Sequence, residues 1–252
     1  MPNVLVEQKN RTTIVTLNRP ERRNALTIEL LTELSAALDV ASADAQKRVL
    51  ILRGAGQAFC AGLDLQETTV VEKAHRSAEI VAKTLLAISQ TRLITIAQVH
   101  GAAVAGGAGL MSACDFVVAA ERTKIGYPET KRGLVAGLVM TFLRRQLRER
   151  DIRELLFTGD LISAERAREI GLVNRVVPPN ELENETQKIV EAVLQNAPVA
   201  LASTKRLIEE LWSSTVKEDV ESALRHHMEA RESAEAKEGI AAFLEKRAPN
   251  WA

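Results

Sequence analysis

Two glycine-rich turns are the segments whose residue types could hold a ligand. Gly54–Gly62 follows the apolar run Arg48–Arg53, and Ala105–Gly109 follows the apolar run Leu93–Val99. Small residues let a ligand approach the backbone closely, and a helix that starts at Gly106 points free N–H groups outward. Two such groups from separate turns could bind one carbonyl oxygen and stabilise negative charge on it, as in an oxyanion hole. Tight packing is the alternative explanation for the same glycines.

Other uses of glycine-rich turns do not fit this spacing. Phe59 stands where a dinucleotide-binding motif beginning at Gly54 would have its third glycine. No Gly-Lys-Ser/Thr follows either turn, which excludes a P-loop. The chain also lacks a Gly-x-Ser-x-Gly segment, which argues against an α/β-hydrolase nucleophile.

Glu129 is the candidate proton-transfer residue. It follows Pro128 in a turn, and a carboxylate among apolar neighbours can have a raised pKa and act as general acid/base. By itself, a solvated loop glutamate explains the same residue. His100, just before the second turn, is interpreted as structural.

The elements around these residues predict an α/β fold. We expect a hairpin, a helix that begins after Thr27, buried strands before both glycine-rich turns, and helices from Leu182 to the end, with a chain break near Pro198. Alternating strands and helices imply a mostly parallel sheet with helices packed around it. The expected strands are Val4–Gln8, Thr12–Leu17, Arg48–Arg53, Leu93–Val99, Asp115–Ala119 and Arg175–Val177.

Composition narrows the class of protein. The 33 Lys+Arg residues balance 33 Asp+Glu residues in 252, so the basic excess typical of nucleic-acid binding is absent. A hydrophobic content of 46% argues against disorder. No signal peptide or membrane span is apparent, so we expect a cytoplasmic protein without membrane partners. Cys60 and Cys114 have no metal-ligand spacing and are expected to be buried, so no metal site is predicted.

Taken together, the motifs resemble the crotonase superfamily, the enoyl-CoA hydratase/isomerase family, over essentially the whole chain. Four segments carry the resemblance: Asn18–Leu26, Ala58–Leu65, His100–Asp115 and Tyr127–Leu134. The pattern Ala105–Gly109 with Gly126–Val135 looks similar to a bacterial subgroup of hydratases that includes methylglutaconyl-CoA hydratases.

The resemblance implies an architecture and partners. It implies a ββα spiral over residues 1–195 that carries the acyl-CoA site, and a helical region over residues 196–252 that packs on neighbouring subunits. It also implies a homotrimer or a dimer of trimers. The substrate is an acyl-CoA thioester, and no separate cofactor is expected because coenzyme A is part of the substrate.

The resemblance also assigns roles to residues. Leu63 and Gly106 match the two oxyanion N–H donors, and Glu129 matches an acid/base. The matched substrate-binding residues are Arg22, Ala25, Leu26, Ala61, Asp64, Leu65, Gln66, Gly107, Pro128 and Lys246. Among these, Lys246, together with Phe243, matches positions that reach a neighbouring subunit's coenzyme A. Pocket walls are expected near Leu65–Val71, Val135–Phe142 and Trp212.

One departure from the family pattern leaves the reaction open. Typical hydratases hold water with two glutamates, and the first falls at Gly109, which cannot orient water or carry a proton. Tyr127, Asp64 or His75 are candidates to replace it. Hydration of a 2-enoyl-CoA, Δ3-Δ2 isomerisation with Glu129 alone, and non-catalytic acyl-CoA binding therefore remain as hypotheses, with thioester hydrolysis or decarboxylation on the same scaffold as lesser ones.

Overall fold

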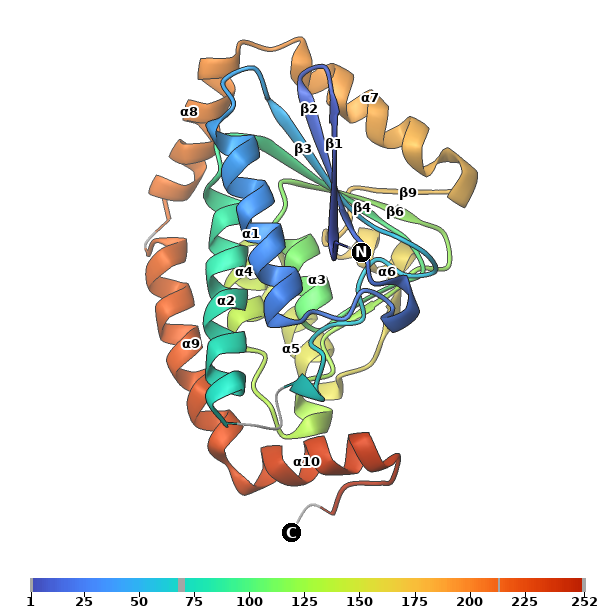
Figure 1. The fold of residues 1–252 in the computed structure, drawn as a ribbon, viewed down its shortest axis with the longest axis vertical. Coiled ribbons are helices and arrows are strands. Elements are labelled where there is room, and N and C mark those ends of the chain that lie inside the picture. Colours follow the sequence, from blue (N-terminus) through green and yellow to red (C-terminus); the bar gives the residue numbers. More distant parts are fainter. Residues whose placement is uncertain (1, 68–70, 213, 251–252) are drawn as a thin grey trace.

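The computed structural model describes residues 2–67, 71–212 and 214–250, and a six-stranded sheet runs through it (Figure 1). The strand order is β1 (Val4–Lys9), β2 (Thr12–Leu17), β3 (Val49–Gly54), β4 (Ile94–Val99), β6 (Phe116–Ala120) and β9 (Arg175–Val177). The hairpin β1–β2 is antiparallel and every other pair is parallel. The expected α/β class and the expected strands are confirmed.

A second, three-stranded sheet was not predicted. It consists of β5 (Ala102–Val104), β7 (Lys124–Gly126) and β8 (Ile162–Ser163). Strands of two or three residues are too short to show an alternating pattern, so the sequence carries little signal for them. β5 and β7 are parallel and pair Val104 with Gly126, so the segments that follow them leave the same sheet edge side by side.

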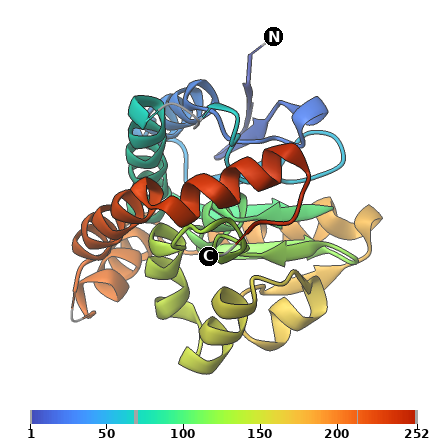
Figure 2. The ribbon, with the colours of Figure 1, turned by 90° about the horizontal axis from the view of Figure 1, so that it is seen from below.

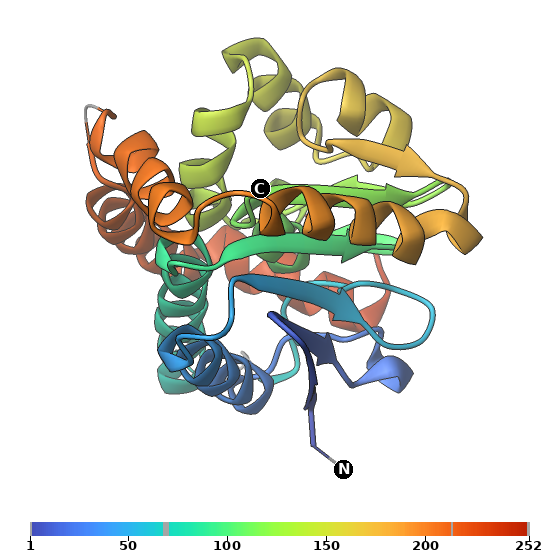
Figure 3. The same ribbon diagram turned by 90° about the horizontal axis from the view of Figure 1, so that it is seen from above.

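Alternation along the strands divides the core between the two faces of the large sheet. Val15 and Leu52 face the larger hydrophobic cluster, whereas their neighbours Ile14 and Ile51 face a smaller one. Helix α7 (Leu182–Leu194) covers the smaller cluster, as Figure 3 shows from above. The strands β2, β3, β4 and β6 are therefore buried on both faces, which explains their continuous apolar runs, whereas β1 is exposed along most of its length.

Helices α1 (Ile28–Ala43) and α2 (Val71–Gln90) cover the opposite face. Thr27 caps α1 as predicted, because its side chain accepts a hydrogen bond from Leu30 N–H at 3.1 Å. The remaining helices are α3 (Gly106–Ser112), α4 (Gly137–Gln146), α5 (Glu149–Thr158), α6 (Ala164–Glu169), α8 (Pro198–Glu210), α9 (Val216–Glu232) and α10 (Ala234–Glu245). Among the described residues, no helix has the length and apolar character needed to cross a membrane.

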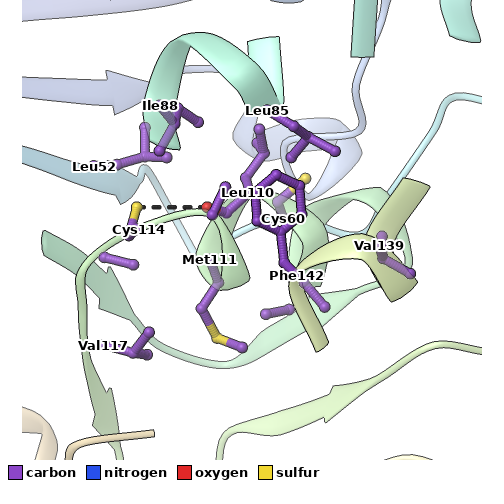
Figure 4. Close-up of a cluster of buried hydrophobic side chains, with 14 of the residues drawn as sticks. Leu52, Cys60, Leu85, Ile88, Leu110, Met111, Cys114, Val117, Val139 and Phe142 are labelled. Carbon is purple, nitrogen blue, oxygen red and sulfur yellow. Dashed lines mark hydrogen bonds between the residues drawn. The ribbon is translucent and has the colours of Figure 1, made fainter. Parts of the chain in front are cut away.

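The core around α3 contains both cysteines (Figure 4). Cys60 and Cys114 are buried, as predicted, and both are free cysteines. Burial raises the pKa of each thiol to about 12, so both thiols stay protonated and unreactive.

The C-terminal helices pack largely on their own chain. α9 lies along α2 and α4, and α10 crosses the end of the molecule beside residues 130–132 (Figures 1 and 2). Among the α-helices of the described residues, α8 is the one that buries none of its residues, and it exposes Val199 and Ile208. The expected packing of residues 196–252 on neighbouring subunits therefore stays a prediction that concerns α8 most directly, and the division at residue 195 likewise stays a prediction.

Candidate active site

Two adjoining cavities form the candidate site. The inner chamber, of about 90 Å3, is lined by Ala61, Leu63, Leu65, Ala78, Val81, Val104–Gly106, Glu129, Arg132, Leu134–Val139, His227 and Phe243. The outer groove, of about 290 Å3, is lined by Glu21–Arg23, Ala25, Ala61, Leu63–Gln66, Phe243 and Leu244. Ala61, Leu63, Leu65 and Phe243 line both, so the outer groove leads into the inner chamber.

Asn24 ties the arginine-bearing loop to the first glycine-rich turn. Its side chain is fully buried, and Nδ2 donates hydrogen bonds to the carbonyl oxygens of Ala55 at 2.9 Å and Ala58 at 2.8 Å. Its φ of 56° is left-handed, a conformation that asparagine tolerates better than most residues. The outer groove is therefore built on a fixed loop.

The N–H groups of Leu63 and Gly106 are available to a ligand. Leu26 N–H donates to Gly62 O, and Asp64 N–H donates to Leu26 O, whereas Leu63 N–H between them has no acceptor in the described residues. Gly106 is the first residue of α3, where N–H groups lack an intrahelical partner. A Cβ on Gly106 would lie 3.9 Å from Leu63 Cγ, so the two turns are neighbours.

Ala105 has a backbone conformation that is rare outside glycine. Its φ is 50° and its ψ is −123°, immediately before Gly106. Such conformations cost on the order of 1–3 kcal/mol and cluster at functional sites. In this turn the conformation sets where α3 begins and therefore where its first N–H groups point.

Glu129 lies just after β7 and points its carboxylate into a buried position. Its side chain is 8% exposed, and its Oε2 atom is buried without a hydrogen-bond partner in the described residues. Burial raises the pKa of Glu129 to about 7, against smaller opposing effects from a backbone N–H and from the charge of Arg132. Near neutral pH the carboxyl group can therefore both accept and donate a proton.

Arg132 lies one turn after Glu129 and also lines the inner chamber. Its Nη1 donates to the carbonyl oxygen of Pro128 at 3.0 Å, and its guanidinium stacks on the ring of Phe243 at 4.4 Å. Phe243, expected at a neighbouring subunit's site, thus lies where its own chain's two cavities meet.

The position of the family's first glutamate is filled by apolar side chains. A Cβ on Gly109 would lie 2.7 Å from Val139 Cγ1 and 3.7 Å from Leu85 Cδ2. A side chain larger than the hydrogen atom of glycine fits at position 109 only if Val139 moves. Position 109 therefore lacks the carboxylate of typical hydratases, and Val139 and Leu85 occupy the space that its side chain would need.

None of the three candidate replacements lines the inner chamber. The Tyr127 hydroxyl is fully buried and shares a hydrogen bond with Ser112 Oγ at 2.7 Å. Asp64 lies in the outer groove and pairs with Arg19 at 3.3 Å, while His75 Nε2 lies 3.1 Å from Glu232 Oε1. Over the described ranges, Glu129 is the one carboxylate of the inner chamber.

His227 is a chamber residue that sequence reasoning missed. Its Nδ1 lies 3.0 Å from Val135 O, and its Nε2 accepts a hydrogen bond from Arg231 Nε at 3.1 Å. Burial lowers the pKa of His227 to about 4, so the ring is neutral and Nδ1 carries the proton. The sequence did contain a signal, because His227 and Arg231 are four residues apart and therefore lie on the same face of one helix. It was missed because this region was interpreted as helices that pack on neighbouring subunits.

The other predicted substrate residues divide into three groups. Arg22, Ala25, Ala61, Asp64, Leu65 and Gln66 line the outer groove. Leu26, Gly107 and Pro128 are buried and line neither cavity within the described ranges. Lys246 is exposed beyond the end of α10 and outside both linings, so a role at a neighbouring subunit's site stays a prediction.

The residues of the expected pocket walls line two different cavities. Val135–Val139 line the inner chamber, but Phe142 and Trp212 line a separate cavity of about 780 Å3 beside α8. Residues 68–70 of the expected wall Leu65–Val71 lie outside the described residues. Within those described, His, Cys, Asp and Glu form no group of three that could hold a metal.

Comparisons with known proteins find relatives that match nearly the whole chain. The model of a family described as enoyl-CoA hydratase/isomerase matches residues 7–252. A putative enoyl-CoA hydratase of Thermus thermophilus is 39% identical, over 97% of this chain and 98% of that protein. A crotonyl-CoA hydratase of Syntrophomonas wolfei is 33% identical, over 99% and 97%. The crystal structure of carnitinyl-CoA hydratase from Mycobacterium avium has a TM-score of 0.87 at 31% identity, covering 100% of this chain and 98% of that one.

Proposed function

Because the chain belongs to the enoyl-CoA hydratase/isomerase family, we propose that it hydrates a 2-enoyl-CoA with Glu129 as general acid/base. The observation that carries this proposal is the buried carboxylate of Glu129, with a pKa of about 7, in the same chamber as Leu63 and Gly106, whose N–H groups have no acceptor among the described residues. A base and two oxyanion donors around one small chamber suit proton transfer next to a thioester carbonyl.

The two cavities suggest how the substrate binds. Arg22 and Arg23 are exposed along the outer groove, where their charges can meet the phosphates of coenzyme A. The pantetheine arm then passes Ala61 and Leu65 into the inner chamber. This path places the thioester carbonyl beside Leu63 and Gly106.

The chemistry follows from the placement of the proton-transfer group. As a water oxygen adds to C3, its proton moves to ionised Glu129 and negative charge develops on the thioester oxygen. The N–H donors stabilise this enolate, each by about 3 kcal/mol, and Glu129 returns the proton to C2. General acid/base catalysis contributes ~100–10,000-fold.

The size of the inner chamber favours a short acyl group. About 90 Å3 is roughly the liquid volume of three water molecules, enough for a few carbon atoms. The crotonyl-CoA hydratase of Syntrophomonas wolfei, by its name, acts on a four-carbon acyl group. A branched, methylglutaconyl-like group is included in this proposal and requires the chamber to open further.

Isomerisation of a 3-enoyl-CoA is the second candidate, and the packing at Gly109 favours it. Because Val139 fills the place of a second carboxylate, water has a single acid/base partner in the chamber. In isomerisation Glu129 alone removes a proton from C2 and returns it at C4, which needs no water. A non-catalytic acyl-CoA-binding protein is the third candidate.

An assay of crotonyl-CoA and a 3-enoyl-CoA, with wild type and Glu129→Gln, separates the three candidates. Turnover of crotonyl-CoA that falls at least 100-fold in the variant supports hydration by Glu129. Turnover of the 3-enoyl-CoA alone supports isomerisation. Binding of both thioesters without turnover supports the non-catalytic candidate, and full activity of the variant refutes the role of Glu129.

We also propose that the protein is a cytoplasmic homotrimer or dimer of trimers. The support for assembly is the apolar surface of α8 and its C-cap residue, where Val199, Leu207, Ile208 and Leu211 are exposed. Light scattering during size-exclusion chromatography gives the mass of the assembly, and a monomer at micromolar concentration would refute it.

A further inference from the structure

Two side chains of the inner chamber, Glu129 and Arg132, each have a buried polar atom without a hydrogen-bond partner in the described residues. The two atoms are Oε2 of Glu129 and Nε of Arg132. An ionised carboxylate only accepts hydrogen bonds, and a guanidinium only donates them. Because a buried polar group is costly when it stays unpaired, two complementary ones in the same chamber point to a partner that they share.

The guanidinium of Arg132 is fixed at the chamber by contacts on several sides. The N–H of Arg132 donates to Glu129 O at 2.9 Å, so the two residues lie one turn apart. Its Nη1 donates to Pro128 O at 3.0 Å, and its guanidinium carbon lies 4.4 Å from the centre of the Phe243 ring. α10 packs on its backbone, since a Cβ on Gly239 would lie 2.4 Å from the Arg132 carbonyl carbon. The unpaired Nε therefore belongs to a side chain with a defined position.

Glu129 and Arg132 are near neighbours that do not satisfy each other. Burial is the largest influence on the pKa of each group, but the charge of Arg132 opposes it at Glu129, and the charge of Glu129 opposes it at Arg132. Such mutual effects require a short distance between the two charges. The two unpaired atoms nevertheless form no hydrogen bond with each other.

A single water molecule can pair with both atoms, because water donates and accepts hydrogen bonds. It would donate to Glu129 Oε2 and accept from Arg132 Nε. Buried waters typically occupy sites of this kind, with about three hydrogen bonds to polar groups that are otherwise unpaired. The chamber, of about 90 Å3, is large enough to hold one.

The other polar side chain that the described residues contribute to the chamber cannot take this role. His227 already uses both ring nitrogens, since Nδ1 donates to Val135 O at 3.0 Å and Nε2 accepts from Arg231 at 3.1 Å. The position of the carboxylate that typical hydratases use is filled by Val139. Arg132 is therefore the one side chain besides Glu129, within the described ranges of the chamber, that has hydrogen-bonding capacity to spare.

We propose that Arg132 holds the water molecule that adds to C3, in place of the carboxylate that Gly109 lacks. The inference rests on the proposed function, hydration of a 2-enoyl-CoA. Since a guanidinium only donates, the water accepts from Arg132 with one lone pair and attacks C3 with the other. As the O–C3 bond forms, the C2=C3 electron pair moves towards the thioester oxygen, and the water proton passes to Glu129, which returns it to C2. Arg132 keeps all its protons.

Two reactions at the same site separate this role from a merely structural one. Hydration of crotonyl-CoA needs the water, whereas exchange of the C2 protons of butyryl-CoA in D2O needs only Glu129 and the oxyanion donors. Arg132→Met should lower kcat for hydration about 10- to 100-fold and change the exchange rate by less than about threefold. Loss of the Arg132 charge also raises the pKa of Glu129, so both reactions are measured at pH 9, where the carboxyl group is ionised.

Two further variants control for charge and for folding. Lys131 is exposed on the same turn and its Nζ pairs with Asp160 at 2.5 Å, so Lys131→Met should leave both rates unchanged. Arg132→Lys keeps a charged donor and should hydrate crotonyl-CoA faster than Arg132→Met does. The exchange reaction itself shows whether each variant folds with a working Glu129.

The outcomes distinguish this inference from the proposed function. Hydration that survives in Arg132→Met, or an equal loss of hydration and exchange in that variant, overturns the role of Arg132 and leaves hydration as the function. A wild type that exchanges the C2 protons of butyryl-CoA but hydrates no 2-enoyl-CoA refutes hydration, and the role of Arg132 falls with it. A selective loss of hydration in Arg132→Met, partly restored in Arg132→Lys, supports both.

Discussion

Glu129→Gln replaces a buried carboxyl group by a neutral amide of nearly the same shape, and it should make the protein more stable while it removes activity. The side chain is 8% exposed, and burial raises its pKa from 4.5 to about 7. A group that ionises less readily in the folded than in the unfolded state costs stability when it ionises. The difference between 4.5 and about 7 corresponds to about 3 kcal/mol.

Because the pKa of Glu129 is raised in the folded state, its contribution to the free energy of unfolding depends on pH in a defined direction. Below pH 4.5 the carboxyl group is protonated in both states and Glu129 has no such cost. Between pH 4.5 and about 7 the unfolded state loses its proton first, so the wild type becomes less stable as pH rises. Above about pH 7 both states are ionised and the full cost remains, whereas glutamine carries no ionisation cost at any pH.

Urea unfolding at pH 5 and pH 8 measures this difference. The variant should gain about 3 kcal/mol over the wild type at pH 8 and about 1 kcal/mol at pH 5. The exposed Glu121 offers the matched control, since Glu121→Gln should change the free energy of unfolding by less than about 0.5 kcal/mol at either pH. The same preparation should lose ~100–10,000-fold of its turnover.

Two results would each refute one part of the reasoning. The first result is a stability difference between Glu129→Gln and the wild type that is the same at pH 5 and pH 8. In that case the carboxylate is not desolvated, and burial does not raise its pKa. If the variant is more stable at pH 8 but keeps full turnover, the burial is real and the catalytic role is wrong. Stability and activity thus test separate parts of the argument.

Three further substitutions test the oxyanion donor and the packing around the site. Replacing Leu63 by its α-hydroxy acid analogue exchanges one N–H for an ester oxygen, and kcat should fall ~100–1000-fold while a binding assay shows near-normal thioester affinity; unchanged kcat would remove Leu63 from the oxyanion hole. Gly109→Ala should cost about 1–3 kcal/mol in urea unfolding because its Cβ would lie 2.7 Å from Val139 Cγ1, and a second substitution, Val139→Ala, should restore most of the loss. Gly239→Ala should be destabilising although alanine favours helices, because its Cβ would overlap the Arg132 backbone; a higher melting temperature would contradict this contact.

The sequence predicted the large sheet well because its strands carry strong physical signals. Ile14–Leu17 and Leu50–Leu52 are apolar on both faces of the sheet, and Thr27 stands where a helix cap is needed. β5, β7 and β8 left no comparable pattern. These strands position Gly106 and Glu129, so the sequence named these two candidate residues without showing what brings them together.

The site could be predicted only where residues act through local motifs. Glu129 and the glycine-rich turns are such cases, because a turn and its chemistry lie within a few residues of each other. The filling of the Gly109 position depends on Val139, thirty residues later, and the lining by His227 depends on a helix near the end of the chain. Sequence spacing carries no information about contacts of this range, which arise from tertiary packing.

The chamber wall that holds Glu129 depends on the C-terminal helices of its own chain. His227 lies in hydrogen-bond contact with Val135 O, and a Cβ on Gly137 would lie 2.8 Å from Ala223 O, so α9 lies directly against the start of α4. α10 contacts the turn after Glu129 through Gly239. Because these contacts are within one chain, they would set the wall before any subunits assemble. Assembly through α8 would then add stability and any contribution from Lys246, while the environment that raises the pKa of Glu129 would already exist in a single chain.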